Sequence, residues 1–128
     1  MSMRATSGIS KAAKCTAAIA AQYTIATFGA DDDTLSVASG AANSLVGVFQ
    51  STTANPGDSV EVMVTGISSV VLGGNVTRGD YITSAANGSG VTAAPAAGAN
   101  ANVIGIALES GVSGDIIAVL LAPGRIQG

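Results

Sequence analysis

Short apolar segments bounded by turn residues recur along this 128-residue chain. Apolar and polar residues alternate within 58–65, and a period of two is typical of a half-buried β-strand. One face of that strand carries Val60, Val62 and Val64, and the other carries Ser59, Glu61, Met63 and Thr65. Further short strands are expected at 23–28, 67–72, 80–84, 103–108 and 115–121. Many short strands at close spacing predict an all-β fold, a small single-domain β-barrel or β-sandwich.

An internal repeat indicates how some of these strands pair. The first copy consists of 46–49, the turn Gly57-Asp58 and 60–62, and the second of 104–107, the turn Gly114-Asp115 and 117–119. Each copy predicts a strand, a turn and a second strand, so the two copies predict paired hairpins in pseudo-symmetric positions. Asp80 also follows a glycine, and we expect all three aspartates to bond the backbone of their turns. The segment 95–102 is expected to be a loop of small residues.

The residue types that are missing exclude several kinds of chemistry. The chain has no histidine and one cysteine, so histidine-based acid–base catalysis, a Ser-His-Asp triad and a Cys-His pair are impossible within it. Zinc held by histidines or by a cysteine cluster is excluded as well. Cys15 has no intrachain disulfide partner and is expected to be an inert core residue. We expect no enzyme activity, no catalytic residues and no cofactor.

Three short motifs have a functional and a plain structural interpretation, and the structural one is favoured each time. The acidic run 31–33 resembles a ligand set for Ca²⁺ or Mg²⁺ but lacks EF-hand spacing, so we expect a solvated turn and no metal site. The integrin-type tripeptide 78–80 runs directly into an expected strand. Asn75 and Asn87 match the glycosylation pattern, and without a secretion signal both matches are expected to be incidental.

Charge and hydropathy limit the partners of the chain. The net charge is −3 and the sequence pI is about 4.4, whereas nucleic-acid binding needs a cationic surface. The longest apolar run, 116–123, is far shorter than the ~20 residues that span a bilayer. The alanine-rich segment 15–21 is too weakly apolar to be the core of a signal peptide. We therefore expect no nucleic acid and no membrane among the partners.

The charges are distributed unevenly along the chain. Residues 1–30 contain three cations, Arg4, Lys11 and Lys14, and no acid, whereas 31–128 contain two arginines and all eight acids. We predict an N-terminal arm at 1–22 and a β-rich domain at 23–128. Within the arm, 11–22 is compatible with helix or strand, and strand is favoured. The three cations are candidates for contact with an acidic partner surface, and an ordinary solvated terminus is the alternative.

The core of this chain is expected to be thin. Only 3% of the residues are aromatic, and alanine supplies much of the hydrophobic fraction. Methyl groups contribute less hydrophobic stabilisation than larger side chains do. Small domains with thin cores are usually supplemented by disulfides, metals or association. Since the first two are not expected here, the composition favours an oligomer or a larger assembly.

A series of glycine and aliphatic positions extends over about residues 30–124. It comprises 45–49, 56–58, 60–62, 66–67, 70–74, Val76, 78–80, 83–84, 87–88, 104–110, 114–115 and 119–124. In this series the chain resembles the small capsid cement (head decoration) proteins of tailed bacteriophages. The resemblance rests on ordered glycine and aliphatic residues rather than on catalytic ones.

The resemblance implies a structural virion protein, made in the host cytoplasm, on the outer surface of the capsid. Such proteins commonly form homotrimers, bridge major capsid protein subunits and stabilise the head. Arg4, Lys11 and Lys14 would then meet carboxylates of the capsid. Deletion of 1–14 is expected to weaken head binding and to leave the domain folded. The alternatives are another virion component, such as a minor capsid or tail-tube protein, or a secreted surface or adhesin module.

Overall fold

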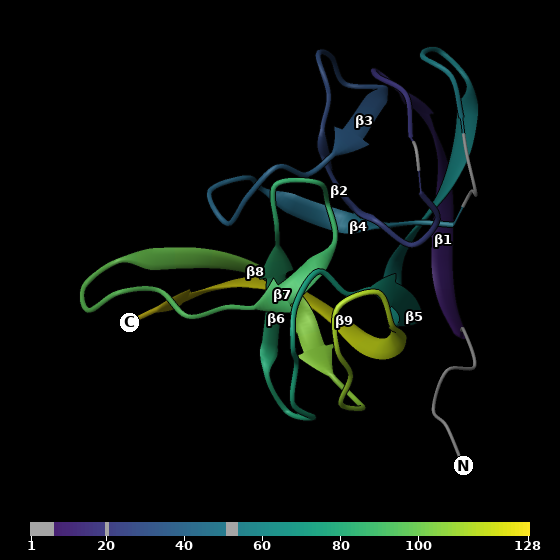
Figure 1. Ribbon diagram of the computed structural model, residues 1–128. Coiled ribbons are helices and arrows are strands. Elements are labelled where there is room, and N and C mark those ends of the chain that lie inside the picture. Colours follow the sequence, from purple (N-terminus) through teal and green to yellow (C-terminus); the bar gives the residue numbers. More distant parts are fainter. Residues whose placement is uncertain (1–6, 20, 51–53) are drawn as a thin grey trace.

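The computed structural model describes residues 7–19, 21–50 and 54–128, which contain nine β-strands and no helix (Figure 1). The strands are β1 (Ser7–Cys15), β2 (Ile25–Phe28), β3 (Thr34–Val37), β4 (Leu45–Phe49), β5 (Ser59–Val71), β6 (Tyr81–Ser84), β7 (Gly90–Thr92), β8 (Asn100–Ala107) and β9 (Ile116–Gln127). The all-β fold predicted from the alternation and the turns is confirmed.

Five strands close into a barrel. Their order around the wall is β1, β3, β2, β4 and β5, and β5 pairs back with β1 from Ser7 to Lys14. The parallel contact of β1 with β3 is short, with Lys14 opposite Thr34 and Cys15 opposite Leu35. The other pairs in the ring are antiparallel. The single domain is therefore built on a barrel rather than on a sandwich.

A second part of the sheet extends from the barrel through β5. Because β5 is 13 residues long, its second half continues beyond the barrel and pairs with β9, and β8, β6 and β7 follow in that order. The distal ends of β8 and β9 pair as a two-stranded ribbon, with Asn100 opposite Gln127. This ribbon projects away from the barrel (Figure 1, left).

Two apolar cores lie on opposite sides of the wall formed by β4 and β5. Phe49 and Val62 are opposite each other and face the barrel core, whereas the neighbouring pair Val48 and Met63 faces the second core. The barrel core consists of Cys15, Ile19, Ala26, Leu35, Phe49, Val60 and Val62. The second core lies between this wall and the inner face of the extended sheet. Met63, expected on the polar face of its strand, is therefore only 6% exposed.

The structure joins two predicted strands and adds two that the sequence did not predict. Segments 58–65 and 67–72 form one strand, because a bulge near Val64 and the positive φ of Gly66 (102°) bend β5 without ending it. The short strands β3 and β7 were not predicted. The prediction of a loop at 95–102 is wrong at its C-terminal end. There β8 begins at Asn100 and is held by pairing with β9.

The predicted arm 1–22 contains a strand of the barrel wall. Residues 7–15 form β1, which confirms strand for 11–15, and Cys15 is 1% exposed in the barrel core. Residues 1–6 and 20 lie outside the described residues. Deletion of 1–14 would remove nearly all of a barrel strand, so the structure argues against the expectation that the domain stays folded without these residues.

The Gly-Asp turns follow one geometry at three places. In each turn the aspartate Oδ2 accepts a hydrogen bond from the backbone N–H three residues earlier, at 2.9–3.0 Å. The three donor–acceptor pairs are Asn55–Asp58, Thr77–Asp80 and Val112–Asp115. The glycine before each aspartate has a positive φ, a conformation that favours glycine. These turns lead directly into β5, β6 and β9, which confirms the role expected for the three aspartates.

The predicted hairpins are present and adjoin each other. β4 pairs with β5 and β8 pairs with β9, and the sheet order β4-β5-β9-β8 places the two hairpins symmetrically about the β5–β9 pair. Gly47 and Gly105 occupy corresponding positions in the two copies. A Cβ atom at Gly47 would collide with the carbonyl oxygen of Met63, and one at Gly105 with that of Leu120.

Candidate interaction surfaces

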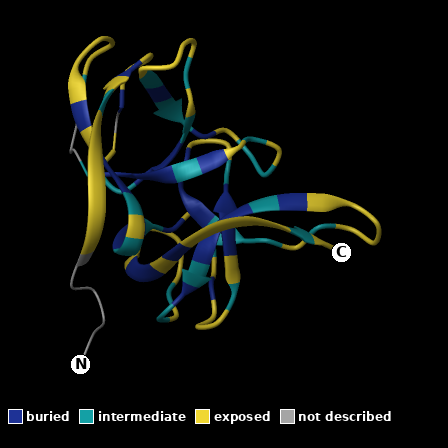
Figure 2. Ribbon diagram, turned by 180° about the vertical axis from the view of Figure 1, so that it is seen from behind, coloured by how far each residue is buried: buried dark blue, intermediate teal, exposed yellow. Residues whose placement is uncertain are grey.

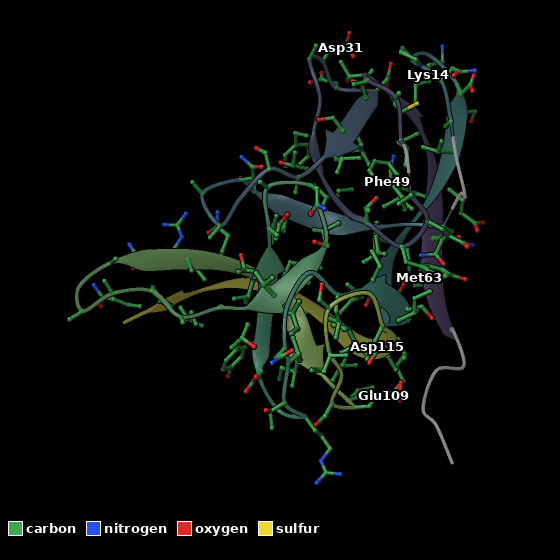
Figure 3. All side chains as sticks on the ribbon, in the orientation of Figure 1. Lys14, Asp31, Phe49, Met63, Glu109 and Asp115 are labelled. Atoms are coloured by element: carbon green, nitrogen blue, oxygen red, sulfur yellow. The ribbon has the colours of Figure 1, made fainter. Side chains whose placement is uncertain are left out.

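The aspartates of the acidic run 31–33 and of the three Gly-Asp motifs lie in or at the ends of turns. Asp31, Asp32 and Asp33 are exposed between β2 and β3. No group of three or more His, Cys, Asp or Glu side chains in the described part of the chain is arranged to hold a metal ion. Figure 3 shows Asp31 at the top of the molecule and Asp115 far below it, near Glu109. The structure therefore does not bring these carboxylates into one site.

The tripeptide 78–80 is held within its turn. Asp80 Oδ2 accepts hydrogen bonds from the Thr77 N–H (2.9 Å) and the Thr92 hydroxyl (2.8 Å). The Arg78 N–H donates to Ser110 Oγ at 2.9 Å. The Asp80 carboxylate is thus already bonded to its own turn and to Thr92 on β7. This arrangement favours a structural role for the tripeptide over integrin binding.

Cys15 is placed as a core residue. Its thiol is in the barrel core and donates a hydrogen bond to the Asn55 carbonyl oxygen at 2.9 Å. A buried thiol is out of reach of a solvent-borne substrate. No helix in residues 7–19, 21–50 and 54–128 is long and apolar enough to cross a membrane.

The three candidate cations do not form a described cluster. Arg4 lies outside the described residues, and Lys11 and Lys14 are exposed on β1. Lys11 is opposite the buried Val62 and Lys14 is opposite the exposed Ser59. Since residues three apart on a strand point to opposite faces, the two lysines are directed to different sides of β1. Figure 3 shows Lys14 at the same end of the barrel as Asp31.

Sequence reasoning missed a partly exposed apolar surface that extends from β1 onto the extended sheet, which we call the apolar face. It consists of Ile9 on β1, Ile67 and Val71 on β5, Tyr81 on β6, Ile106 on β8, and Ile116 and Leu120 on β9. Ile9 is 65%, Tyr81 47% and Leu120 41% exposed. The signal lay in 116–121, where both alternating sets of side chains are apolar although a strand at a surface buries only one face.

These features define a small all-β module whose candidate sites are the surfaces of its strands. No family model and no curated protein matches the chain. Among solved structures, it is similar to the N base of head fiber gp8.5 of bacteriophage phi29, with a TM-score of 0.67. That match has 19% sequence identity and covers 94% of this chain and 98% of the other. The likeness establishes a shared fold.

Proposed function

We propose that the protein is a structural component of a bacteriophage virion, bound to the outer surface of the head. There it bridges major capsid protein subunits, acts as a homotrimer and stabilises the shell. One observation carries the proposal: nearly the whole chain shares its fold with the base of a phage head fiber. The resemblance of the glycine and aliphatic positions to cement proteins points to the same particle.

The proposed activity is adhesion without a chemical step or a cofactor. Three aspartates and the thiol support this, because Asp58, Asp80 and Asp115 cap turns and Cys15 is buried. A contact surface on a strand suits such a role, since strands present side chains in fixed rows. Several modest contacts repeated by symmetry give far greater avidity than one contact does.

Strand β1 is the candidate contact element for the capsid. It is exposed over most of its length in Figure 2 and carries Lys11 and Lys14, both exposed. In this proposal the two lysines meet carboxylates of the major capsid protein, together with Arg4. Because the lysines point to different sides of the strand, each would contact a different part of the capsid surface.

Co-sedimentation with heads of the encoding phage, prepared without this protein, tests the proposal. The full chain is expected to bind saturably at a fixed copy number per head and to raise the temperature at which the heads release their genome. The double variant Lys11→Glu/Lys14→Glu is expected to bind more weakly. Arg78→Glu, an exposed charge reversal in the turn before β6, is the matched control and is expected to bind like the natural chain.

Two results would contradict parts of the proposal. Absence of saturable binding to heads would overturn the head assignment. Assembly of the free protein into stacked rings would then support a tail-tube component. Arg78→Glu should bind heads as tightly as the natural chain does. If the double variant also binds heads that tightly, β1 is not the contact element.

A further inference from the structure

A groove of about 450 Å³ lies between the start of β4 and the distal part of β9, and we call it the ribbon groove. It is lined by Ser44, Leu45, Asn102, Pro123, Gly124 and Arg125. Because β1 pairs along one edge of β5 from Ser59 to Ile67, β4 and β9 must share the other edge, β4 at 62–63 and β9 at 66–71. Past these pairings the two strands separate, and the ribbon groove lies between them (Figure 1).

The distal part of β9 has one edge without a partner strand. β9 pairs with β5 only from Ile116 to Leu121, whereas its pairing with β8 continues to Gln127. From 122 to 127 the edge on the side of β5 therefore has no partner strand in the described part of the chain. All four residues of 122–125 are exposed, so the faces of the strand are uncovered there as well.

The pairing with β8 shows which backbone groups point to this free edge. The Asn102 N–H donates to the Ala41 carbonyl oxygen at 2.9 Å, and the Asn102 carbonyl oxygen accepts from Thr83 Oγ1 at 2.7 Å. Both groups of Asn102 thus point away from β9, so Asn102 and Arg125 form a non-hydrogen-bonded pair. Arg125 accordingly directs its own N–H and C=O away from β8. Since the two kinds of pair alternate, Gln127 does the same.

The charge of the ribbon groove indicates what could bind there. Arg125 carries the one charged side chain among the residues that line it. Its Nε donates to Asn102 Oδ1 at 3.0 Å, which holds the guanidinium beside the groove and leaves the two Nη groups for a further acceptor. A carboxylate matches the geometry of a guanidinium better than any other side chain does.

We propose that the ribbon groove binds an extended acidic segment of a partner protein. The segment adds as a further strand to the free edge of β9, where the N–H and C=O groups of Arg125 and Gln127 bond its backbone. A carboxylate of the segment meets the Arg125 guanidinium. The inference goes beyond the proposed function, because it assigns a second contact, made by backbone pairing, on strands other than β1.

The length of the free edge sets the expected size and strength of this contact. The five residues 123–127 extend for about 16 Å at the rise of a β-strand, so they accommodate a segment of about five residues. Pro123 has no N–H to donate, so the donors of the edge are concentrated at its distal end. Arg125 is exposed, so binding is expected to weaken as the salt concentration is raised.

A displayed library of random twelve-residue peptides, selected on the immobilised full chain, tests the proposal. Selection is expected to enrich peptides that contain aspartate or glutamate. Arg125→Glu is expected to lose these acidic peptides. Arg78→Glu is the matched control, because it reverses an exposed arginine in a turn that does not line the groove, and it should enrich the same peptides as the natural chain.

A second variant separates strand addition from attraction by charge alone. Gln127→Pro removes one outward N–H at an edge position, where proline is tolerated, and keeps Arg125. It is expected to bind a selected acidic peptide about fivefold more weakly, the effect of one net hydrogen bond. In the natural chain, the bound peptide is expected to slow amide hydrogen exchange at Arg125 and Gln127, measured by NMR.

Three results would overturn the proposal. They are a selection that enriches no acidic peptide, acidic peptides that bind Arg125→Glu as tightly as the natural chain, and a bound peptide that leaves exchange at Arg125 and Gln127 unchanged. No heads are used in these experiments, and the variants leave Lys11 and Lys14 in place. Failure here is therefore distinct from failure of head binding through β1.

Discussion

At the scale of single residues, Gly47 and Gly105 are positions in the two hairpins where the backbone of a neighbouring strand leaves no room for a side chain. A Cβ atom at either position would lie against the carbonyl oxygen of Met63 or Leu120 on the partner strand. The repeat therefore preserves a packing requirement at corresponding places in two hairpins, and not only a pattern of apolar residues.

Gly105→Ala is expected to lower the free energy of unfolding by about 1–3 kcal/mol, because the added methyl group forces β8 away from β9. Urea denaturation of the purified protein measures this change. Gly40→Ala is the control, since nothing lies within 4 Å of a Cβ at Gly40. Equal free energies of unfolding for the two variants would show that β8 and β9 accommodate the methyl group without loss of stability.

Residue-level predictions from the sequence succeeded where the interaction is local. The carboxylates of Asp58, Asp80 and Asp115 bond a backbone group only three residues away, so turn chemistry alone was sufficient. The burial of Met63 was not predictable in this way. It depends on a second core that covers the outer side of β5, and the alternation of 58–65 contains no information about that core.

At the scale of elements, β1 and β5 form the contact that closes the barrel. β1 pairs with β5 at Ser7–Lys14, but with β3 only at Lys14 and Cys15. The existence of most strands followed from local patterns, whereas this pairing joins segments some fifty residues apart. β3 and β7 are four and three residues long, and their partners, rather than their own sequences, define them as strands.

Deletion of 1–15 is expected to abolish the cooperative thermal transition, because it opens the barrel and exposes Val60 and Val62. Deletion of 1–6 retains all five barrel strands and is expected to keep a transition close to that of the full chain. Circular dichroism during heating measures both. A chain without 1–15 that melts like the full chain would mean that β1 is dispensable for the fold.

At the scale of the whole molecule, one wall serves both cores. Adjacent residues of β4, Val48 and Phe49, enter different cores, and so do Val62 and Met63 of β5. Loss of either core therefore removes support from the wall of the other. The barrel and the extended sheet are expected to unfold as a single unit.

Phe49→Ala in the barrel core and Ile104→Ala in the second core test this coupling. Each side chain is 0% exposed, so each truncation is expected to lower the free energy of unfolding by about 2–5 kcal/mol. Calorimetry should record one transition, shifted to lower temperature, for both variants. Two separate transitions in either variant would show that the cores are independent.

The surfaces were the least predictable part of the molecule. The sequence identified Lys11 and Lys14 as candidate contact cations, but not that they point to different sides of one strand. It did not identify the apolar face, because Tyr81, Leu120 and Ile9 become neighbours only through the pairing of distant strands. Charge is evident from composition, but a surface patch depends on topology.

The pairing of β1 with β5 also imposes an order of events on the ribosome. Ser7–Cys15 is synthesised early, but the part of β5 that pairs with it is complete only after Ile67 has been added. Until then β1 lacks its main pairing partner, and its unpaired backbone N–H and C=O groups are available to other chains. Long-range pairings of this kind slow folding. A growing chain of this protein therefore closes its barrel only after about half of its length has been made, so translation speed and chaperone capture would affect its yield.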